Sequence, residues 1–273
     1  MNSNPGLSKP ATQPSLFVPH GAPTFALRPG AAGAALVRIA ATLPHPRAIV
    51  IVSPHWNTAA PKVGFADRPR TIHDFGGFPR ELYAIHYPAS GCKEAAIEVL
   101  TSLTEAGFAA EGDDARGLDH GAWLPLRLMF PDADVPVIPL SIQAHLGPAH
   151  HWAIGRALAP LAEKGFLIVA SGNLTHNLAD FQLAHRTSGP APAYVREFAD
   201  WIWRHLETHD IATLFDYRRQ APGALRAHPT DDHLLPLYVA LGAARPGAPV
   251  TRLHAGIDDY VIAMDAFTFQ TGH

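Results

Sequence analysis

The hydrophobic positions of this chain follow two alternating patterns. Uninterrupted apolar runs, which are typical of strands buried on both faces of a parallel sheet, occupy residues 15–19, 48–52, 135–142 and 166–170. Segments whose apolar residues recur at a helical period lie between them, at residues 30–43, 93–106, 123–129 and 150–164. The alternation predicts an α/β fold, a single domain whose mostly parallel central sheet is flanked by helices.

The two ends of the chain extend this prediction. Residues 193–206 carry aromatic and aliphatic side chains at helical spacing and predict a core helix. A helix is predicted to begin within residues 229–237, with Thr230 or Asp231 as its cap and His233 in its first turn. One or two closing strands are expected within residues 257–268. Residues 1–14, rich in Ser, Asn, Pro and Gln, predict a flexible leader, which leaves residues 15–273 as one domain.

Composition and charge narrow the class of protein. The net charge of −3 comes from 21 basic and 24 acidic residues without a long run of either sign, which argues against nucleic acid and anionic membranes as partners. No segment approaches the roughly 18 apolar residues of a membrane helix. The single cysteine, Cys92, excludes an internal disulfide and fits a reducing compartment. A cytoplasmic protein with a small-molecule partner is therefore expected.

Two of the apolar runs end in a histidine. His20 follows Val18-Pro19, and His55 follows Ser53-Pro54 and precedes a tryptophan. The β-α-β order predicts that both histidines lie just past the carboxyl ends of neighbouring parallel strands, which is the edge where ligands bind in open α/β sheets. Neutral imidazoles on rigid strand ends are suitable metal ligands. We therefore predict a metal or active site at this edge.

A metal site of this kind needs about three protein ligands. His233 is the favoured third ligand, and His228, Asp231 and Asp232 are close enough in sequence to compete with it. His120 and His176 lie in similar glycine-flanked or strand-end segments. Spacing alone does not divide ligands from acid–base groups. The remaining histidines, His150 and His151 among them, are assigned no role.

Six ordered motifs resemble the DOPA-dioxygenase type of class III extradiol ring-cleaving dioxygenases, relatives of the catalytic subunit of protocatechuate 4,5-dioxygenase. The resemblance runs from about Leu16 to the C-terminus. The motifs are residues 18–23 (VPHGAP), 52–56 (VSPHW), 71–79 (TIHDFGGFP), 118–123 (LDHGAW), 170–177 (ASGNLTHN) and 228–233 (HPTDDH).

The resemblance implies a role for each histidine in these motifs. His20 and His55 would bind the metal, His233 would be its third ligand, His176 would be the acid–base catalyst and His120 a further active-site group. The implied enzyme uses Fe(II) and O2 to open the ring of a catechol, DOPA-like or smaller, to a semialdehyde. In the protocatechuate branch the third ligand is a glutamate. Because three imidazoles also suit zinc, Zn(II) is the alternative metal.

The loop of residues 71–79 contributes further candidates. Its two glycines, its proline and its aromatic residues predict an ordered loop over the site, in which His73 and Asp74 would orient a ligand or line the pocket. Two other functions use the same residues. One is a zinc-dependent hydrolase, and the other is a non-enzymatic binding protein like the Memo proteins, which are similar to this family. A homo-oligomer is also possible.

Overall fold

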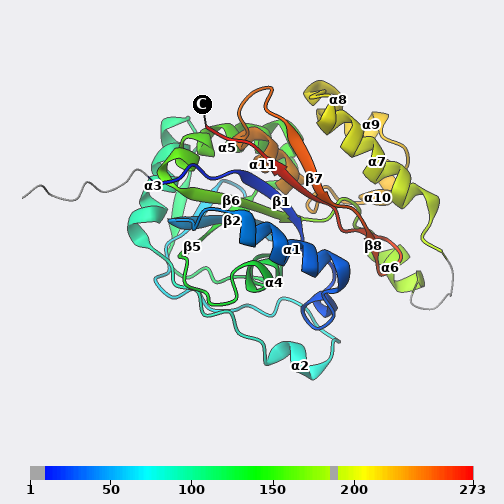
Figure 1. The fold of residues 1–273 in the computed structure, drawn as a ribbon, viewed down its shortest axis with the longest axis horizontal. Coiled ribbons are helices and arrows are strands. Elements are labelled where there is room, and N and C mark those ends of the chain that lie inside the picture. Colours follow the sequence, from blue (N-terminus) through cyan, green and yellow to red (C-terminus); the bar gives the residue numbers. More distant parts are fainter. Residues whose placement is uncertain (1–9, 185–189, 273) are drawn as a thin grey trace, which may run out of the picture.

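The computed structural model describes residues 10–184 and 190–272. They form an eight-stranded mixed sheet in the order β4-β3-β5-β2-β6-β1-β10-β7. Figure 1 shows this sheet between layers of helices, which confirms the predicted α/β class. The strands are β1 (Ser15–Pro19), β2 (Ala48–Asn57), β3 (Lys62–Gly64), β4 (Glu111–Asp113), β5 (Val137–Ile142), β6 (Phe166–Gly172), β7 (Val250–His254) and β10 (Ala266–Phe269).

The four central strands are parallel. β2 pairs with β5 on one side and with β6 on the other, and β6 pairs in turn with β1. The prediction that β1 and β2 are neighbours is therefore wrong, because β6 lies between them. The carboxyl ends of all four strands still meet at one edge. The outer strands are antiparallel to their neighbours at β1–β10, β10–β7 and β3–β5.

The absence of polar alternation in the central strands follows from helices on both faces of the sheet. In β2, Ile49 and Ile51 belong to the core beneath α1 and α4, whereas Val50 and Val52 belong to the core beneath α3 and α5. Figure 1 shows α1 and α4 on one side of the sheet and α5 and α11 on the other. These helices are α1 (Gly30–Thr42), α3 (Lys93–Glu105), α4 (His120–Met129), α5 (Gly147–Leu158) and α11 (Leu235–Ala243).

The predicted core helix of residues 193–206 is α7 (Ala193–Glu207), and its Tyr194, Phe198, Trp201 and Ile202 are buried. It packs beside β7 and the two-stranded ribbon β8–β9 (Figure 1). The remaining short elements lie in the loops or near α7. They are α2 (Arg80–Tyr83), α6 (Leu178–Ala184), α8 (Ile211–Phe215), α9 (Tyr217–Gln220), α10 (Ala224–Ala227), β8 (Ile257–Asp258), β9 (Ile262–Ala263) and the 3-10 helices η1 (Pro23–Ala26), η2 (Ala144–Leu146) and η3 (Ala159–Lys164).

Several helix boundaries differ from the prediction. The helix expected to begin at Thr230 or Asp231 begins only at Leu235, and neither residue caps it. The backbone carbonyl of Asp231 instead accepts hydrogen bonds from the N–H groups of Leu234 and Leu235, which closes a turn before the helix. His233 therefore lies in this turn. In contrast, α4 begins earlier than expected, at His120, with the Asp119 side chain as its cap.

The N-terminal residues are described only from Pro10 onward, so most of the predicted leader lies outside the described residues. Gln13 belongs to the predicted leader but is fully buried. Its backbone N–H donates to Ala162 O at 3.1 Å and its side chain to Pro44 O at 3.0 Å. The chain is thus already packed against the domain two residues before β1.

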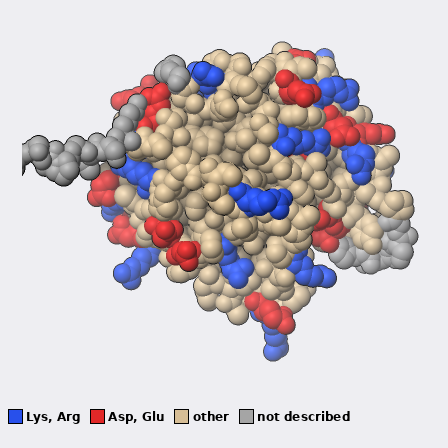
Figure 2. Space-filling model, viewed as in Figure 1, with Lys and Arg blue, Asp and Glu red and all other residues tan. Residues whose placement is uncertain are grey.

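Acidic and basic side chains are interspersed on the face of the molecule shown in Figure 2. The mixture agrees with the near-neutral net charge of −3. Among the described residues, no helix combines the length and the apolar character that crossing a membrane requires.

Candidate metal centre and active site

The first histidine of the site follows the end of β1. His20 is fully buried, and its Nδ1 shares a hydrogen bond of 3.0 Å with Ser171 Oγ on β6. Gly21 turns the chain away with a φ of +60°, and a Cβ at this position would lie 3.0 Å from the Met264 side chain. Its N–H donates to Asn173 Oδ1 at 3.0 Å. The strand ends of β1 and β6 thus hold the His20 ring in place.

His55 lies within the last residues of β2, not beyond its end as predicted. The pairing of β2 with β5 shifts register between Val52 and Asn57, so the backbone between these residues leaves the regular pattern of hydrogen bonds between the two strands. Ser53 Oγ accepts the His55 N–H at 3.3 Å and donates to Asp119 Oδ1 at 2.6 Å. Asp119 also forms an ion pair with Arg116. This buried polar network fixes the bulged segment that carries His55.

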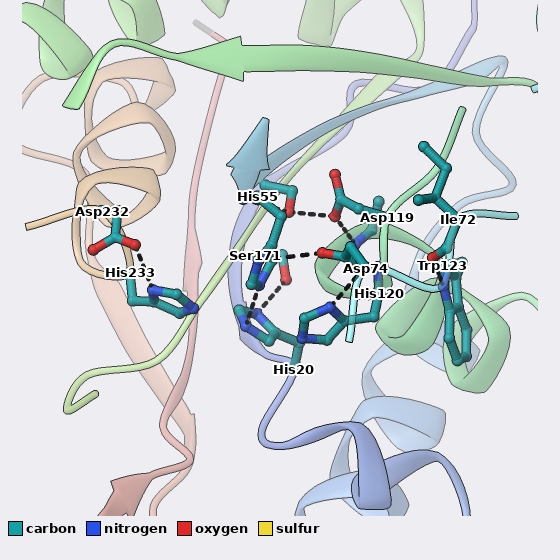
Figure 3. A network of polar contacts seen from close by, with 12 residues as sticks. His20, His55, Ile72, Asp74, Asp119, His120, Trp123, Ser171, Asp232 and His233 are labelled. Atoms are coloured by element: carbon teal, nitrogen blue, oxygen red, sulfur yellow. Dashed lines mark hydrogen bonds and ion pairs between the residues drawn. The ribbon is translucent and has the colours of Figure 1, made fainter. Parts of the chain in front are cut away.

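His233 approaches from the opposite side, on the turn before α11 (Figure 3). Its Nδ1 donates to Asp232 Oδ2 at 3.0 Å. Its Nε2 is buried and has no hydrogen-bond partner among the described residues. A buried ring nitrogen of this kind costs free energy unless something binds it. A metal ion is a suitable occupant, because Asp232 already holds the proton on the other nitrogen.

The fold brings together the three histidines expected to be metal ligands. The ligand nitrogens of His20, His55 and His233 lie within 4.8 Å of one another. Their ring centroids are 5.0 to 5.3 Å apart, and the His20 and His55 Nε2 atoms approach to 3.4 Å. Burial is the main factor that lowers the pKa of all three rings, to about 4 for His55. The rings are therefore neutral at pH 7, which is the form that binds metals.

His120, the first residue of α4, is held by Asp74 from the loop of residues 71–79. Asp74 Oδ1 accepts both the backbone N–H and the Nδ1–H of His120 at 2.9 Å, and Oδ2 lies 3.3 Å from His55 Nδ1. Burial would raise the pKa of Asp74, but these contacts outweigh it and lower the pKa. One carboxylate therefore fixes both a member of the histidine triad and a neighbouring histidine (Figure 3).

The close approach of α4 to His55 depends on Gly121. A Cβ at this position would lie 2.4 Å from Ser53 Oγ and 2.8 Å from His55 Cδ2. A glycine is thus required here by space, because any Cβ would overlap Ser53 and His55 at the end of β2. The ring centroids of His55 and His120 consequently lie only 4.1 Å apart.

His176 lies four residues beyond the end of β6 and stacks on His233. The two rings are nearly parallel, with an interplanar angle of 5° and centroids 3.4 Å apart. The His176 N–H donates to Ala227 O at 2.8 Å, which anchors its backbone. Burial, assisted by His120 and opposed by Asp232, lowers the pKa of His176 to about 4. The ring is neutral at pH 7 and can accept a proton.

All five histidines, His20, His55, His120, His176 and His233, line one cavity of about 590 Å³. This volume lies in the range of roughly 300–1,000 Å³ that is usual for small-molecule pockets. Most of the remaining wall is apolar. It includes Phe75 and Phe78 from the loop of residues 71–79, Leu178 and Phe181 from α6, Pro23 and Ile262.

The other candidates do not join the three histidines as possible metal ligands among the described residues. His73 is absent from the described lining of the cavity, and its Nε2 instead forms a hydrogen bond of 3.0 Å with Ile85 O. His228 is buried and donates through Nε2 to Leu174 O at 2.7 Å. Asp231 is paired with Arg218, and Asp232 contacts His233. None of the last three joins the group formed by His20 and His55 among the described residues.

Apart from Asp74, the sequence analysis does not indicate the partners that hold the histidine rings. Ser171 lies in an apolar strand, and only the pairing of β6 with β1 brings it to His20. Asp232 was considered as a ligand, whereas the structure places it against Nδ1 of the adjacent His233. The α6 wall was also missed, although the two leucines and the phenylalanine of its short apolar segment were an available signal.

Comparisons with known proteins agree with this geometry. The model of a family described as the catalytic LigB subunit of aromatic ring-opening dioxygenase matches residues 32–257. The chain is 37% identical over 259 residues to a Beta vulgaris protein named 4,5-DOPA dioxygenase extradiol, covering 93% of this chain and 96% of the relative. It is 38% identical over 251 residues to a protein of the same name from Escherichia coli K12, covering 90% of each.

A solved structure shows the same fold. It is a crystal structure of an uncharacterized protein from Escherichia coli K12, with a TM-score of 0.79 and 31% sequence identity. The match covers 94% of this chain and 99% of that one.

Proposed function

This chain belongs to the LigB family of extradiol, aromatic ring-opening dioxygenases, and we propose that it opens a catechol ring, DOPA-like or smaller, with Fe(II) held by His20, His55 and His233. The observation that carries the proposal is the convergence of these three neutral imidazoles, including the unpartnered Nε2 of His233, at the end of a cavity of about 590 Å³. The names of the relatives support DOPA as the first substrate to examine.

The three histidines suit such a metal ion. Each of the rings of His20 and His233 has its Nδ1 in a hydrogen bond, to Ser171 and Asp232 respectively. With the proton on Nδ1, Nε2 is left as the ligand atom. Hydrogen bonds of this kind orient metal-bound histidines and make them more basic. When bound, Fe(II) would supply adjacent sites for the catechol oxygens and for O2, together with a path for electrons between them.

His176 is the proposed acid–base catalyst. Its ring lines the cavity, is neutral at pH 7 and stacks on the proposed ligand His233 with the ring centroids 3.4 Å apart, so it lies beside the position proposed for the catechol. A neutral imidazole there can take the proton of a catechol hydroxyl and return it to the product. General acid–base catalysis of this type typically contributes about 10²- to 10⁴-fold.

His120 and Asp74 form the second proposed acid–base unit. Because Asp74 holds the Nδ1–H of His120, its Nε2 is left to bind or exchange a proton with a substrate oxygen. Asp74 is absent from the described lining of the cavity and acts by positioning His120 and His55. His73, which is bonded to the backbone of Ile85, supports the fold of the same loop.

The proposed reaction balances without a further reductant. Both oxygen atoms of O2 enter the substrate, one carbon–carbon bond beside the diol breaks, and the product is a ring-opened semialdehyde. The apolar wall formed by Phe75, Phe78 and Phe181 supports an aromatic substrate. The single, half-buried Cys92 supports a reducing compartment, and we infer a cytoplasmic location.

The test is oxygen uptake by the protein after anaerobic loading with Fe(II). With DOPA, 4-methylcatechol or catechol, we expect one O2 consumed per molecule of yellow ring-opened product. Tight binding of zinc without oxygen uptake after iron loading would support the zinc hydrolase instead. Absence of both metal binding and turnover would support a binding protein.

A further inference from the structure

The wall of the cavity carries a charge pattern that bears on the side chain of the substrate. Its described lining contains no lysine or arginine, and its acidic residue is Asp232. Two described arginines that contact residues in or beside the lining segments are engaged in ion pairs. Arg226 donates to Asp180 Oδ2 at 2.8 Å, and Arg218 is paired with Asp231. No cation of the described lining is therefore available to a negatively charged substituent.

The uncharged polar side chains next to this apolar wall, Asn177 and Thr230, are engaged within the protein. Asn177 donates from Nδ2 to Arg226 O at 2.7 Å and accepts the Asp180 N–H on Oδ1 at 3.0 Å. Thr230 Oγ1 donates to Asp232 Oδ1 at 2.7 Å. A carboxylate placed beside Asn177 and Thr230 would lose hydration and would have to compete with the hydrogen bonds that these side chains already make, which is unfavourable. It would also face the Asp232 carboxylate.

Resting on the proposed function, we propose that the cavity selects catechols whose side chain bears no net negative charge. The apolar wall of Phe75, Phe78, Phe181 and Leu178 accepts an uncharged substituent on the ring, and the volume of about 590 Å³ leaves room for one. A zwitterionic substituent is also accepted, because its ammonium group can face Asp232 and offset the cost of its carboxylate. The diol is recognised at the histidine end, so the side chain is directed along this wall. Substrates with a carboxylate as their only charged group are discriminated against.

The test compares two compounds of equal length, 3-(3,4-dihydroxyphenyl)propionate and its primary amide, with the Fe(II)-loaded protein. We expect kcat/KM for the amide to exceed that for the carboxylate by about tenfold or more, the effect of one unscreened like-charge contact. Anaerobic calorimetry should give the same order of binding. Equal or stronger binding and turnover of the carboxylate would overturn the inference.

A charge added to the wall supplies a matched control. Leu178 lines the cavity and its side chain is exposed, so a longer polar side chain can be accommodated there. Leu178→Arg should raise the carboxylate-to-amide ratio, whereas Leu178→Gln should leave it unchanged. An unaltered ratio in Leu178→Arg would contradict a selection by charge. If no catechol is opened, the proposed function fails, and the binding order still decides this inference.

Discussion

Two groups of histidines lie near the carboxyl edge of the same parallel strands, and they differ in how their ring nitrogens are used. The triad of His20, His55 and His233 directs its nitrogens toward one another within 4.8 Å, and Nε2 of His233 has no partner among the described residues. His151, which packs under the end of β5, has both nitrogens engaged. Nδ1 donates to Gly147 O at 2.7 Å, and Nε2 accepts the Gln143 N–H at 3.2 Å.

Burial does not separate the two groups. His20, His233 and His151 are all at most 3% exposed, and burial lowers the pKa of each. What differs is the second hydrogen bond. A histidine whose two nitrogens are both satisfied by the backbone fills a structural role, whereas a buried nitrogen without a partner, aimed at two others, indicates a ligand.

The largest effect is expected when a ligand of the triad is removed. His55→Ala should lower bound iron to background and abolish ring opening, because two imidazoles and water bind Fe(II) much more weakly than three imidazoles. His151→Ala, the control from the other group, should retain the full iron content. Iron analysis after anaerobic loading and circular dichroism of both variants test this. A His55→Ala protein with full iron content would refute the ligand assignment.

The next effect separates catalysis from metal binding within the cavity. His176→Ala should keep its iron and lose about 10²- to 10⁴-fold in turnover, since it removes the acid–base group and no ligand. The measurement is kcat by oxygen uptake beside iron content on the same sample. Iron loss equal to that of His55→Ala would show that the division of roles is wrong.

Asp74→Asn tests the carboxylate that joins His55 to His120. The amide introduced by this substitution has one oxygen and no charge, so it cannot accept from Nδ1 of both His55 and His120 as the Asp74 carboxylate does. With the three ligands intact, metal affinity should therefore fall by about 10- to 100-fold. The matched control is Asp134→Asn, because Asp134 also contacts a histidine, His45, but on the exposed surface at 3.1 Å. Titration with Fe(II) should show no change for this control. Equal Fe(II) affinities of Asp74→Asn and Asp134→Asn would contradict the positioning role of Asp74.

The same contrast shows which features the sequence could predict. Apolar runs, helical periods and histidines at strand ends are local patterns, so β2, α7 and the candidates His20 and His55 could be predicted from them. Local patterns left His233 in competition with His228, Asp231 and Asp232, and only the family resemblance singled it out. The position of β6 between β1 and β2 could not, because the pairing of Ser15 with Ile168 joins residues far apart in the chain. The helix start at Leu235 was misplaced since the Asp231 carbonyl, not its side chain, closes the preceding turn.

The direction of side chains in loops is the second feature that the sequence does not predict. His73 and Asp74 are adjacent and were given the same role, yet one bonds to Ile85 O and the other to two site histidines. A loop with glycines and a proline has no fixed period, so the sequence does not tell which neighbour faces the cavity. The hydrogen-bond partners of the triad depend likewise on tertiary contacts.

The smallest effect concerns the structural histidine and is measured as stability. Burial lowers the pKa of His151 to about 4 in the folded protein, against an ordinary value of about 6.5 when unfolded. Between these values the unfolded chain binds the extra proton, so the free energy of unfolding must fall as the pH is lowered through this window. In metal-free protein, the free energy of unfolding should fall between pH 7.5 and 5.5 by about 1 kcal/mol less for His151→Gln than for wild type. Urea unfolding at the two pH values measures this difference. The other buried histidines are shared by both proteins and cancel in the comparison. An equal fall in the free energy of unfolding would therefore contradict a neutral, structural His151.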